Sequence, residues 1–389
     1  MRSDWKKTTI DEACTRVYSG GTPSTKEPAY WNGDMNWLSS GETCNKFIYE
    51  TERKITKLGV EQSSTQLAFK DSIVIATAGQ GYTRGQASFL KIDTYVNQSV
   101  LVLEADRTMV EPLFLYYNLS NRYEELRQLS DGTSTRGGLS GWIVRRMAIN
   151  LPPIDIQKKI VDVLYAIDQK IECNIAINKN LEEQARAIFD SFYLKSKNKV
   201  LFTQMIKILG GGTPKTTERA FWCGQIPFFT PKDVGNPYVL QTEKYVTELG
   251  LTNCNSRLYP VNTTFVTARG TVGKVSLAGI PMAMNQSCYA LMSDALHPFM
   301  TYFYTLHTVK ALQHKATGAV FDAIVTSDFE SELLHRIPED DASQLLSCIS
   351  PMMENIRVNT VGNLRLTELR DALLPRLMSG KIDVSDIAL

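Results

Sequence analysis

The chain has 389 residues, with 42 Lys and Arg against 41 Asp and Glu, and 43% of its residues are hydrophobic. This length allows two or three domains with a core in each, and the near-zero charge excludes a polycation that coats nucleic acid. The seven Cys are at least 30 residues apart, which excludes zinc-finger spacing and a dense disulfide framework. We therefore expect a reducing, cytoplasmic setting, with no signal peptide, no membrane span and no metal site.

The sequence contains an internal duplication. Four landmarks recur in the same order: GGTP (20–23 and 211–214), an aromatic residue before Trp (30–31 and 221–222), NQS (97–99 and 285–287) and an apolar residue before Pro (151–152 and 337–338). The shift between copies falls from 191 to 186 positions along the chain, as expected when loops differ in length. Two halves of similar fold follow from this order.

In chain order, each half begins with short apolar runs separated by Gly-rich turns, which predict strands at 72–76 and 264–268. Amphipathic helices with an early Pro are predicted at about 111–129 and 297–315. Each half therefore predicts a mixed α+β globule of about 150 residues.

A heptad pattern follows each globule, which predicts two long helices that pair as a coiled coil. The predicted seam residues of the first helix are Ile160, Leu164, Ile167, Ile171, Asn174, Asn178, Leu181, Ile188 and Phe192. Those of the second are Leu345, Ile349, Met352, Ile356, Asn359, Asn363, Leu366, Leu373 and Leu377, with Arg370 as a polar intruder.

Two Asn residues lie in the middle of each seam, and buried amides need partners. In an antiparallel pair, Asn174 faces Asn363 and Asn178 faces Asn359. A parallel pair also brings Asn to Asn, so the sequence leaves the direction open, and solvent-exposed Asn side chains remain the alternative. Pro351 predicts a restart of the second helix after a short preceding segment.

With the order GGTPS, Tyr-Trp, NQS, LPPIDIQKKI (151–160) and a closing LRDALLPRLMSGKI (369–382), the chain resembles the specificity subunit of type I restriction-modification enzymes. The resemblance covers essentially the whole chain. It departs from the pattern at 338–341, where PEDD lacks the second Pro and the Gln-Lys-Lys of the first copy.

This resemblance implies an α+β fold with two similar target-recognition domains, a two-helix antiparallel coiled coil and a pseudo-two-fold repeat. The implied domains are 1–150 and 199–336 for recognition, with spacer helices at 151–198 and 337–389. It also implies a non-catalytic subunit that binds double-stranded DNA, two methyltransferase (modification) subunits and the restriction and translocase subunits. No cofactor is expected on this chain, and S-adenosylmethionine, ATP and Mg are expected on the partners.

The predicted seam from Ile160 to Phe192 is about 50 Å long at 1.5 Å per residue. A rod of this length predicts a bipartite target, in which two different half-sites are separated by a fixed gap. The gap should lengthen when the rod lengthens by whole heptads.

Catalytic motifs are incomplete. The triplet Asn236-Pro237-Tyr238 lacks the second Pro of an adenine methyltransferase loop, and 210–216 lacks the Gly-Lys-Ser/Thr order of a phosphate-binding loop. Both are interpreted as turns. A coiled-coil adaptor that binds only protein and an autonomous methyltransferase remain the alternatives to a DNA-specificity subunit.

The duplication separates two kinds of candidate DNA-contacting residue. Side chains shared by both halves are expected to be structural or to contact phosphate, as for Trp31 and Trp222, whereas unmatched polar side chains on equivalent loops are expected to read bases. A solvated hairpin tip is the alternative for these loops. The candidates are Lys26, Lys46, Gln80, Tyr82, Thr83, Arg84, Ser134, Arg136, Lys215, Arg219, Lys232, Arg269, Thr271, Lys274, Lys315 and Thr317.

The charge is unevenly distributed. Residues 1–150 carry 18 basic and 17 acidic side chains, 199–336 carry 12 and 9, and 337–389 carry 5 and 8. Because affinity for DNA depends on the number of phosphates neutralised, this chain alone should hold DNA poorly. We expect its partner subunits to supply much of the affinity for DNA.

Overall fold

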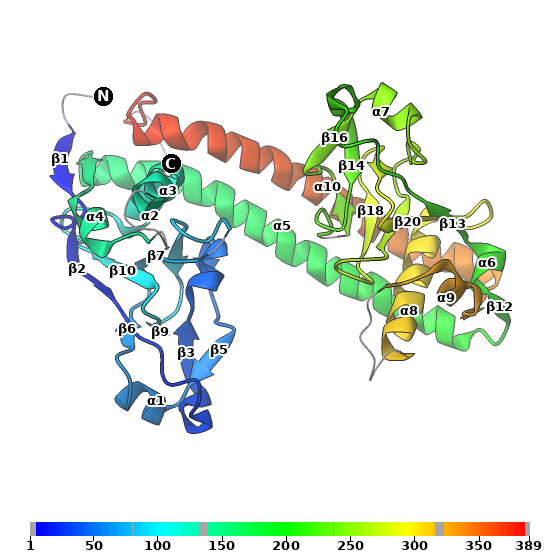
Figure 1. Ribbon diagram of the computed structural model, residues 1–389, viewed down its shortest axis with the longest axis horizontal. Coiled ribbons are helices and arrows are strands. Elements are labelled where there is room, and N and C mark those ends of the chain that lie inside the picture. Colours follow the sequence, from blue (N-terminus) through cyan, green and yellow to red (C-terminus); the bar gives the residue numbers. More distant parts are fainter. Residues whose placement is uncertain (1–4, 80, 132–137, 236, 316–322, 386–389) are drawn as a thin grey trace. The chain divides into compact units, whose positions relative to one another are not determined.

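The computed structural model describes residues 5–79, 81–131, 138–235, 237–315 and 323–385 (Figure 1). The chain divides into two compact units, of which unit 1 comprises 1–169 and 367–389 and unit 2 comprises 170–366. Each unit combines one globular domain with segments of two long helices. These helices are α5 (Ile154–Lys195) and α10 (Glu339–Met378).

The first globular domain contains three sheets. The five-stranded sheet has the order β2-β10-β7-β8-β4, the four-stranded sheet the order β5-β3-β9-β6, and β1 pairs with β11. The strands are β1 (Lys6–Thr9), β2 (Cys14–Ser19), β3 (Trp31–Leu38), β4 (Phe47–Ile48), β5 (Arg53–Ile55), β6 (Gln66–Ala68), β7 (Ile73–Ala76), β8 (Ala87–Leu90), β9 (Thr94–Val96), β10 (Val100–Ala105) and β11 (Ala148–Leu151). The α-helices are α1 (Lys57–Glu61), α2 (Pro112–Ser120), α3 (Tyr123–Asp131) and α4 (Gly141–Arg146), with 3-10 turns η1 (Pro28–Tyr30) and η2 (Ser40–Cys44).

The second globular domain repeats this topology. Its five-stranded sheet has the order β13-β20-β17-β18-β15, its three-stranded sheet the order β16-β14-β19, and β12 pairs with β21. The strands are β12 (Lys199–Leu201), β13 (Lys207–Gly210), β14 (Trp222–Phe229), β15 (Tyr238–Val239), β16 (Lys244–Val246), β17 (Thr264–Thr267), β18 (Val275–Ala278), β19 (Ala283–Met284), β20 (Cys288–Met292) and β21 (Leu333–His335). The helices are α6 (Phe202–Met205), α7 (Glu248–Thr252), α8 (Pro298–Lys315) and α9 (Thr326–Glu330), with η3 (Arg219–Phe221).

The duplication predicted from the sequence is thus confirmed, because the two five-stranded sheets match strand for strand. The counterpart of β6 is reduced to an isolated bridge between Tyr259 and Met282. One predicted helix differs. The segment expected as a single helix at 111–129 forms α2 and α3, with a break at Asn121 and Arg122, whereas its counterpart α8 is continuous.

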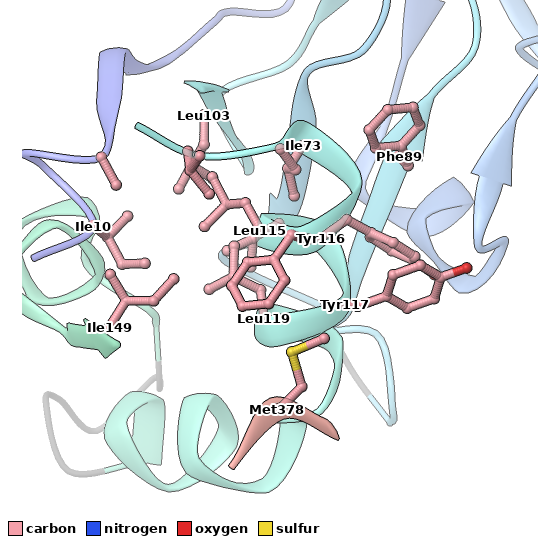
Figure 2. Packing of buried hydrophobic residues seen from close by; sticks show 14 of the residues in the cluster. Ile10, Ile73, Phe89, Leu103, Leu115, Tyr116, Tyr117, Leu119, Ile149 and Met378 are labelled. Atoms are coloured by element: carbon pink, nitrogen blue, oxygen red, sulfur yellow. The ribbon is translucent and has the colours of Figure 1, made fainter. Parts of the chain in front are cut away.

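The core of unit 1 joins the first globular domain to both long helices. Buried residues of α2, including Leu115, Tyr116 and Leu119, pack with Ile10 and with Met378 from the end of α10 (Figure 2). The β-branched residues of β7 are fully buried because both faces of its sheet are covered, one by α2 and the other by residues of the four-stranded sheet. The core therefore depends on chain segments from both termini.

Within unit 2, the two long helices run antiparallel. The Nδ2 of Asn174 donates to the Oδ1 of Asn363 at 2.7 Å, and the Nδ2 of Asn359 donates to the Oδ1 of Asn178 at 2.9 Å. These pairs are the ones expected for the antiparallel alternative, and the alternative of exposed amides is wrong, because Asn174 and Asn178 are buried.

The predicted restart of the second helix at Pro351 is wrong, since α10 continues through it. Pro351 lies on the exposed side of α10, where the loss of one backbone hydrogen bond is compensated by the packing of Ile349 and Met353 on the opposite side. The intruding Arg370 is buried, and its guanidinium is paired with Asp168 of α5 in unit 1.

Of the predicted seam, the fully buried positions are Ile160, Leu164, Asn174, Asn178, Leu345, Ile349, Ile356 and Leu377, and the others are half-buried. Near the end of α5, Phe189 and Tyr193 enter the core of the second globular domain, whereas Ile188 and Phe192 are partly exposed beside it. The heptad pattern did not predict that the buried positions change near the end of α5, because the spacing of apolar residues does not indicate which neighbouring element covers them.

Candidate nucleic-acid interface

Each globular domain presents one glycine-containing hairpin loop at the same place in its five-stranded sheet. In the first domain, residues 77–86 connect β7 to β8, and in the second, 268–274 connect β17 to β18. Both loops use positive φ angles, at Gly81, Gly85, Gly270 and Gly273. These angles turn the backbone sharply and leave the side chains between the glycines at the tip.

The first loop, which we call the 77–86 loop, is held by side chains of α3. Arg127 donates to the carbonyl of Gly81 at 2.6 Å, and the hydroxyl of Tyr123 donates to the carbonyl of Tyr82 at 3.0 Å. The Tyr82 side chain itself is 83% exposed. The backbone is thus anchored while an aromatic ring projects into solvent, an arrangement suited to stacking on a base.

The second loop, the 268–274 loop, is held differently. Thr271 donates to the carbonyl of Pro231 at 3.1 Å, and the backbone of Ala268 accepts from Ile324 at 2.9 Å. The side chains of Arg269 and Lys274 are exposed. Between its two glycines the first loop therefore carries Tyr82, Thr83 and Arg84, whereas the second carries a threonine and a valine there and has its two cations directly outside the glycines.

The remaining candidates lie in several places. Lys26 is exposed before η1, and Lys215 and Arg219 are exposed at the corresponding turn of the second domain. Lys232 is exposed next to Pro231, which contacts the 268–274 loop, and it pairs with Glu243 at 3.4 Å.

Two lysines predicted to contact DNA have internal partners. Lys46 pairs with the buried Asp168 at 3.2 Å, and Lys315 forms an ion pair with Glu332. Gln80, Ser134, Arg136 and Thr317 lie outside the described residues.

The shared motifs have structural roles. The indole nitrogen of Trp31 donates to the carbonyl of Ser24 at 3.0 Å, and that of Trp222 donates to the carbonyl of Lys215 at 3.1 Å. Trp31 is buried and Trp222 half-buried. The two threonines of the GGTP motifs, Thr22 and Thr213, are each hydrogen-bonded to the Gln of the NQS element that follows in the same domain.

Sequence reasoning missed a basic cavity in unit 2. A hollow of about 470 Å³ is lined by Arg186 of α5, Lys274 of the 268–274 loop and Lys310 of α8. Arg186 also approaches Glu182 at 3.6 Å, and Tyr302 donates to the same carboxylate at 3.0 Å. Spacing along the sequence did not indicate this group, because its three cations come from three separate elements.

Sequence reasoning also missed a polar cavity in unit 1. It has a volume of about 360 Å³ and is lined in part by Lys46, Tyr82, Asp168 and Arg370. Asp168 accepts from Tyr117 at 2.9 Å and from Arg370 at 2.7 Å. Burial raises the pKa of Asp168 to about 6, and the hydrogen bond from Tyr117 opposes this shift. The charge of Asp371 raises the pKa further, and because the resulting value is still below 7, the group is mainly a carboxylate at neutral pH.

Within the described residues, no group of three or more His, Cys, Asp and Glu side chains has the geometry of a metal site. In the same part of the chain, every helix is too short or too polar to cross a bilayer.

The fold and the loops define a class: a duplicated recognition protein whose two α+β domains present equivalent loops with different side chains. The profile of the family described as the type I restriction modification DNA specificity domain matches residues 2–183 and 196–341. The chain therefore belongs to this family of type I restriction-modification specificity subunits, with two recognition domains.

Individual relatives agree. The chain is 24% identical to the type I restriction enzyme MjaIX specificity subunit of Methanocaldococcus jannaschii, over 99% of this chain and 95% of that one. It is 22% identical to the HindI specificity subunit of Haemophilus influenzae, over 75% and 82%. A solved type I restriction-modification S subunit from M. genitalium shares the fold, with a TM-score of 0.59, 14% identity and 96% of each chain covered.

Proposed function

We propose that this chain reads a bipartite, asymmetric DNA sequence, with each globular domain contacting one half-site mainly through its hairpin loop. The observation that carries the proposal is the pair of equivalent loops with unlike side chains. Similar folds present the two loops, so we attribute a difference in the bases recognised to their side chains. Arg can bond guanine in two places, whereas Tyr stacks on bases and Thr contacts either a base edge or a thymine methyl group.

The basic cavity supports a second element of binding. Lys274 belongs both to the cavity and to the 268–274 loop, and Arg186 and Lys310 continue the positive charge onto α5 and α8. Phosphate contacts position a protein on DNA without reading its sequence. We assign Arg186 and Lys310 to phosphate contact and Arg269 to base contact.

The long helices support a spacing role. α5 and α10 have 42 and 40 residues and are continuous, so each is about 60 Å long at 1.5 Å per residue. A whole heptad inserted in both helices at facing layers adds about 10 Å, close to three base pairs. We expect the gap between half-sites to lengthen accordingly.

The chain acts, in this proposal, as a non-catalytic scaffold in the cytoplasm. Two methyltransferase subunits and the restriction and translocase subunits join it, and S-adenosylmethionine, ATP and Mg are bound on those partners. The family membership and the weak net charge of both globular domains support this assignment. A protein-only adaptor is disfavoured by the cations that surround the 268–274 loop.

The test is methylation mapping of the chain assembled with its methyltransferase partner. Arg269→Ala should weaken binding to one half-site by about 1–3 kcal/mol, which relaxes or abolishes its recognition, and should leave recognition of the other half-site unchanged. The matched control is Lys207→Ala, an exposed cation of the same domain that pairs with Asp294. Equal loss at both half-sites, or sequence-independent marking by the wild-type complex, would overturn the proposal.

A further inference from the structure

The polar cluster around Asp168 has no polar counterpart at the corresponding place in unit 2. In unit 1, the carboxylate of Asp168 on α5 contacts Arg370 of α10, Tyr117 of α2 and Lys46, which directly precedes β4. The side chain of Asp168 is 4% exposed and that of Arg370 is 9% exposed. This ion pair is therefore a buried one, located where the seam is otherwise apolar or amide-bearing.

The duplication identifies the corresponding residues in unit 2. The helices are related by a shift of 185 positions, which relates Asp168 to Met353 and Ala185 to Arg370. Matching α2 to α8 and β4 to β15 relates Tyr117 to Phe303 and Lys46 to Pro237. Each of the four polar groups is thus replaced by an apolar one.

The unit 2 set is packed as a hydrophobic core. Ala185, Phe303 and Met353 are at most 1% exposed and belong to one cluster. The two units therefore bury the same layer of the helix pair in two different ways, with a charge pair in one and aliphatic and aromatic groups in the other.

This asymmetry decides which helices can pair. Because α5 and α10 are copies of each other, α5 could also pair antiparallel with α5 of a second chain, and α10 with α10. The amide layers do not prevent this, since Asn174 would then face Asn178 of the second chain and Asn359 would face Asn363. The amide hydrogen bonds alone would therefore allow a like pair, in which a helix pairs with its own copy, as readily as the unlike pair of α5 with α10.

The ion pair between Asp168 and Arg370 cannot form in a like pair. In an α5–α5 pair, Asp168 would face Ala185 of the second chain and lose its guanidinium partner. In an α10–α10 pair, Arg370 would enter the site formed by Phe303 and Met353, with no carboxylate from the facing helix. In the like pairs Asp168 would keep Lys46, and Arg370 would keep Asp371 of its own helix, but both of these partners are exposed. Each buried group would lose its one buried partner of opposite charge, and separating a buried ion pair is strongly unfavourable.

We propose that the Asp168–Arg370 ion pair is a specificity device that makes α5 pair with α10 and excludes pairing of either helix with its own copy in a second chain. The choice of helix partner does not depend on the proposed DNA function.

The experiment co-expresses two differently tagged copies of the full chain and measures how much of one is captured with the other, with the mass checked by light scattering. The triple variant Tyr117→Phe/Asp168→Met/Arg370→Ala gives the three buried positions of unit 1 the apolar residues of unit 2 and leaves the exposed Lys46 unchanged. We expect it to fold and to show at least fivefold more cross-capture than wild type. Two chains could also exchange unlike helices, so that α5 of one chain pairs with α10 of the other. The wild-type chain can do this as readily as the variant, so wild-type cross-capture is the control for this exchange.

A second variant removes the discrimination in the opposite way. Ala185→Arg/Met353→Asp supplies the missing partners, so that Asp168 would meet Arg at 185 and Arg370 would meet Asp at 353 in like pairs. It should also raise cross-capture, and it decides the question if the triple variant does not fold. The matched control is Asp162→Met/Arg376→Ala, which makes the same chemical changes at exposed positions of the two helices.

Cross-capture of the control at the level of wild type, together with an increase in either test variant, supports the proposal. Folded test variants that exchange no more than wild type would overturn it, as would a wild-type chain that is itself dimeric through like helices. Neither DNA nor a partner subunit is present in this assay, so its failure is distinct from failure of the DNA-reading proposal.

Discussion

The amide pair between Asn174 and Asn363 makes a quantitative prediction about unit 2. Asn174 is 3% exposed, and its Nδ2 donates to Asn363 at 2.7 Å, whereas its Oδ1 has no hydrogen-bond partner among the described residues. Asn363→Leu removes the acceptor and leaves a second polar atom of the same buried amide without a partner. A buried polar group left unpaired costs about 1–3 kcal/mol.

The double variant should behave differently from the single one. In Asn174→Leu/Asn363→Leu both polar groups are gone and two apolar side chains face each other, so we expect stability near or above that of wild type. For a unit of roughly 200 residues, about 1–3 kcal/mol corresponds to a fall in Tm of about 2–12 °C for the single variant. The control is Asn180→Leu on the exposed side of α5, which should shift the free energy of unfolding by less than about 0.5 kcal/mol.

Scanning calorimetry is the suitable assay, because the two units can unfold in separate transitions and a single-probe Tm would mix them. The reasoning would be refuted if Asn363→Leu matched wild type, or if the double variant were less stable than the single variant. Either result would mean that the amide is satisfied by water or that the helices adjust to hide the loss.

Three further outcomes are expected. Gly273→Ala should lower the stability of unit 2 by about 1–2 kcal/mol in thermal unfolding, because φ is +76° there and a Cβ would lie 2.5 Å from the Nε2 of Gln313; no change would mean that the 268–274 loop relaxes freely. Lys310→Ala should reduce the salt dependence of DNA binding by the assembled complex by about one unit without altering the methylated sequence, and a changed target would contradict its assignment to phosphate. Burial raises the pKa of the Cys14 thiol to about 12, so its thiolate forms only as the pH approaches that value. At pH 8, iodoacetamide should therefore modify the exposed Cys44 far faster than Cys14. Equal rates in the folded chain would show that the Cys14 thiol is not buried.

The duplication, the strand pattern and the register of the two long helices could all be predicted from the sequence. The heptad seam predicted that the amides of Asn174 and Asn178 meet those of Asn359 and Asn363, with Asn174 facing Asn363 in the antiparallel alternative. The direction of the pair was not determined, since both directions bring amide to amide. The hydrogen bonds within unit 2 decided it.

Other features depended on groups that are distant in the sequence. Arg370 appeared only as an interruption of the apolar pattern, because Asp168 lies 202 residues away and outside the predicted a and d positions. The ion pair of Lys46 with Asp168 was not predicted either, because the charge of a lysine does not indicate which carboxylate it meets. The cations of the 470 Å³ cavity likewise belong to three elements that only the fold brings together.

The sequence by itself determined the repeat, the family and the places where the two copies differ, because these depend on local patterns and on their order. Among the described residues, the tertiary structure decided which charged side chains form ion pairs with distant segments. That distinction depends on burial and on partners from distant segments, and a charge is too costly to bury without them.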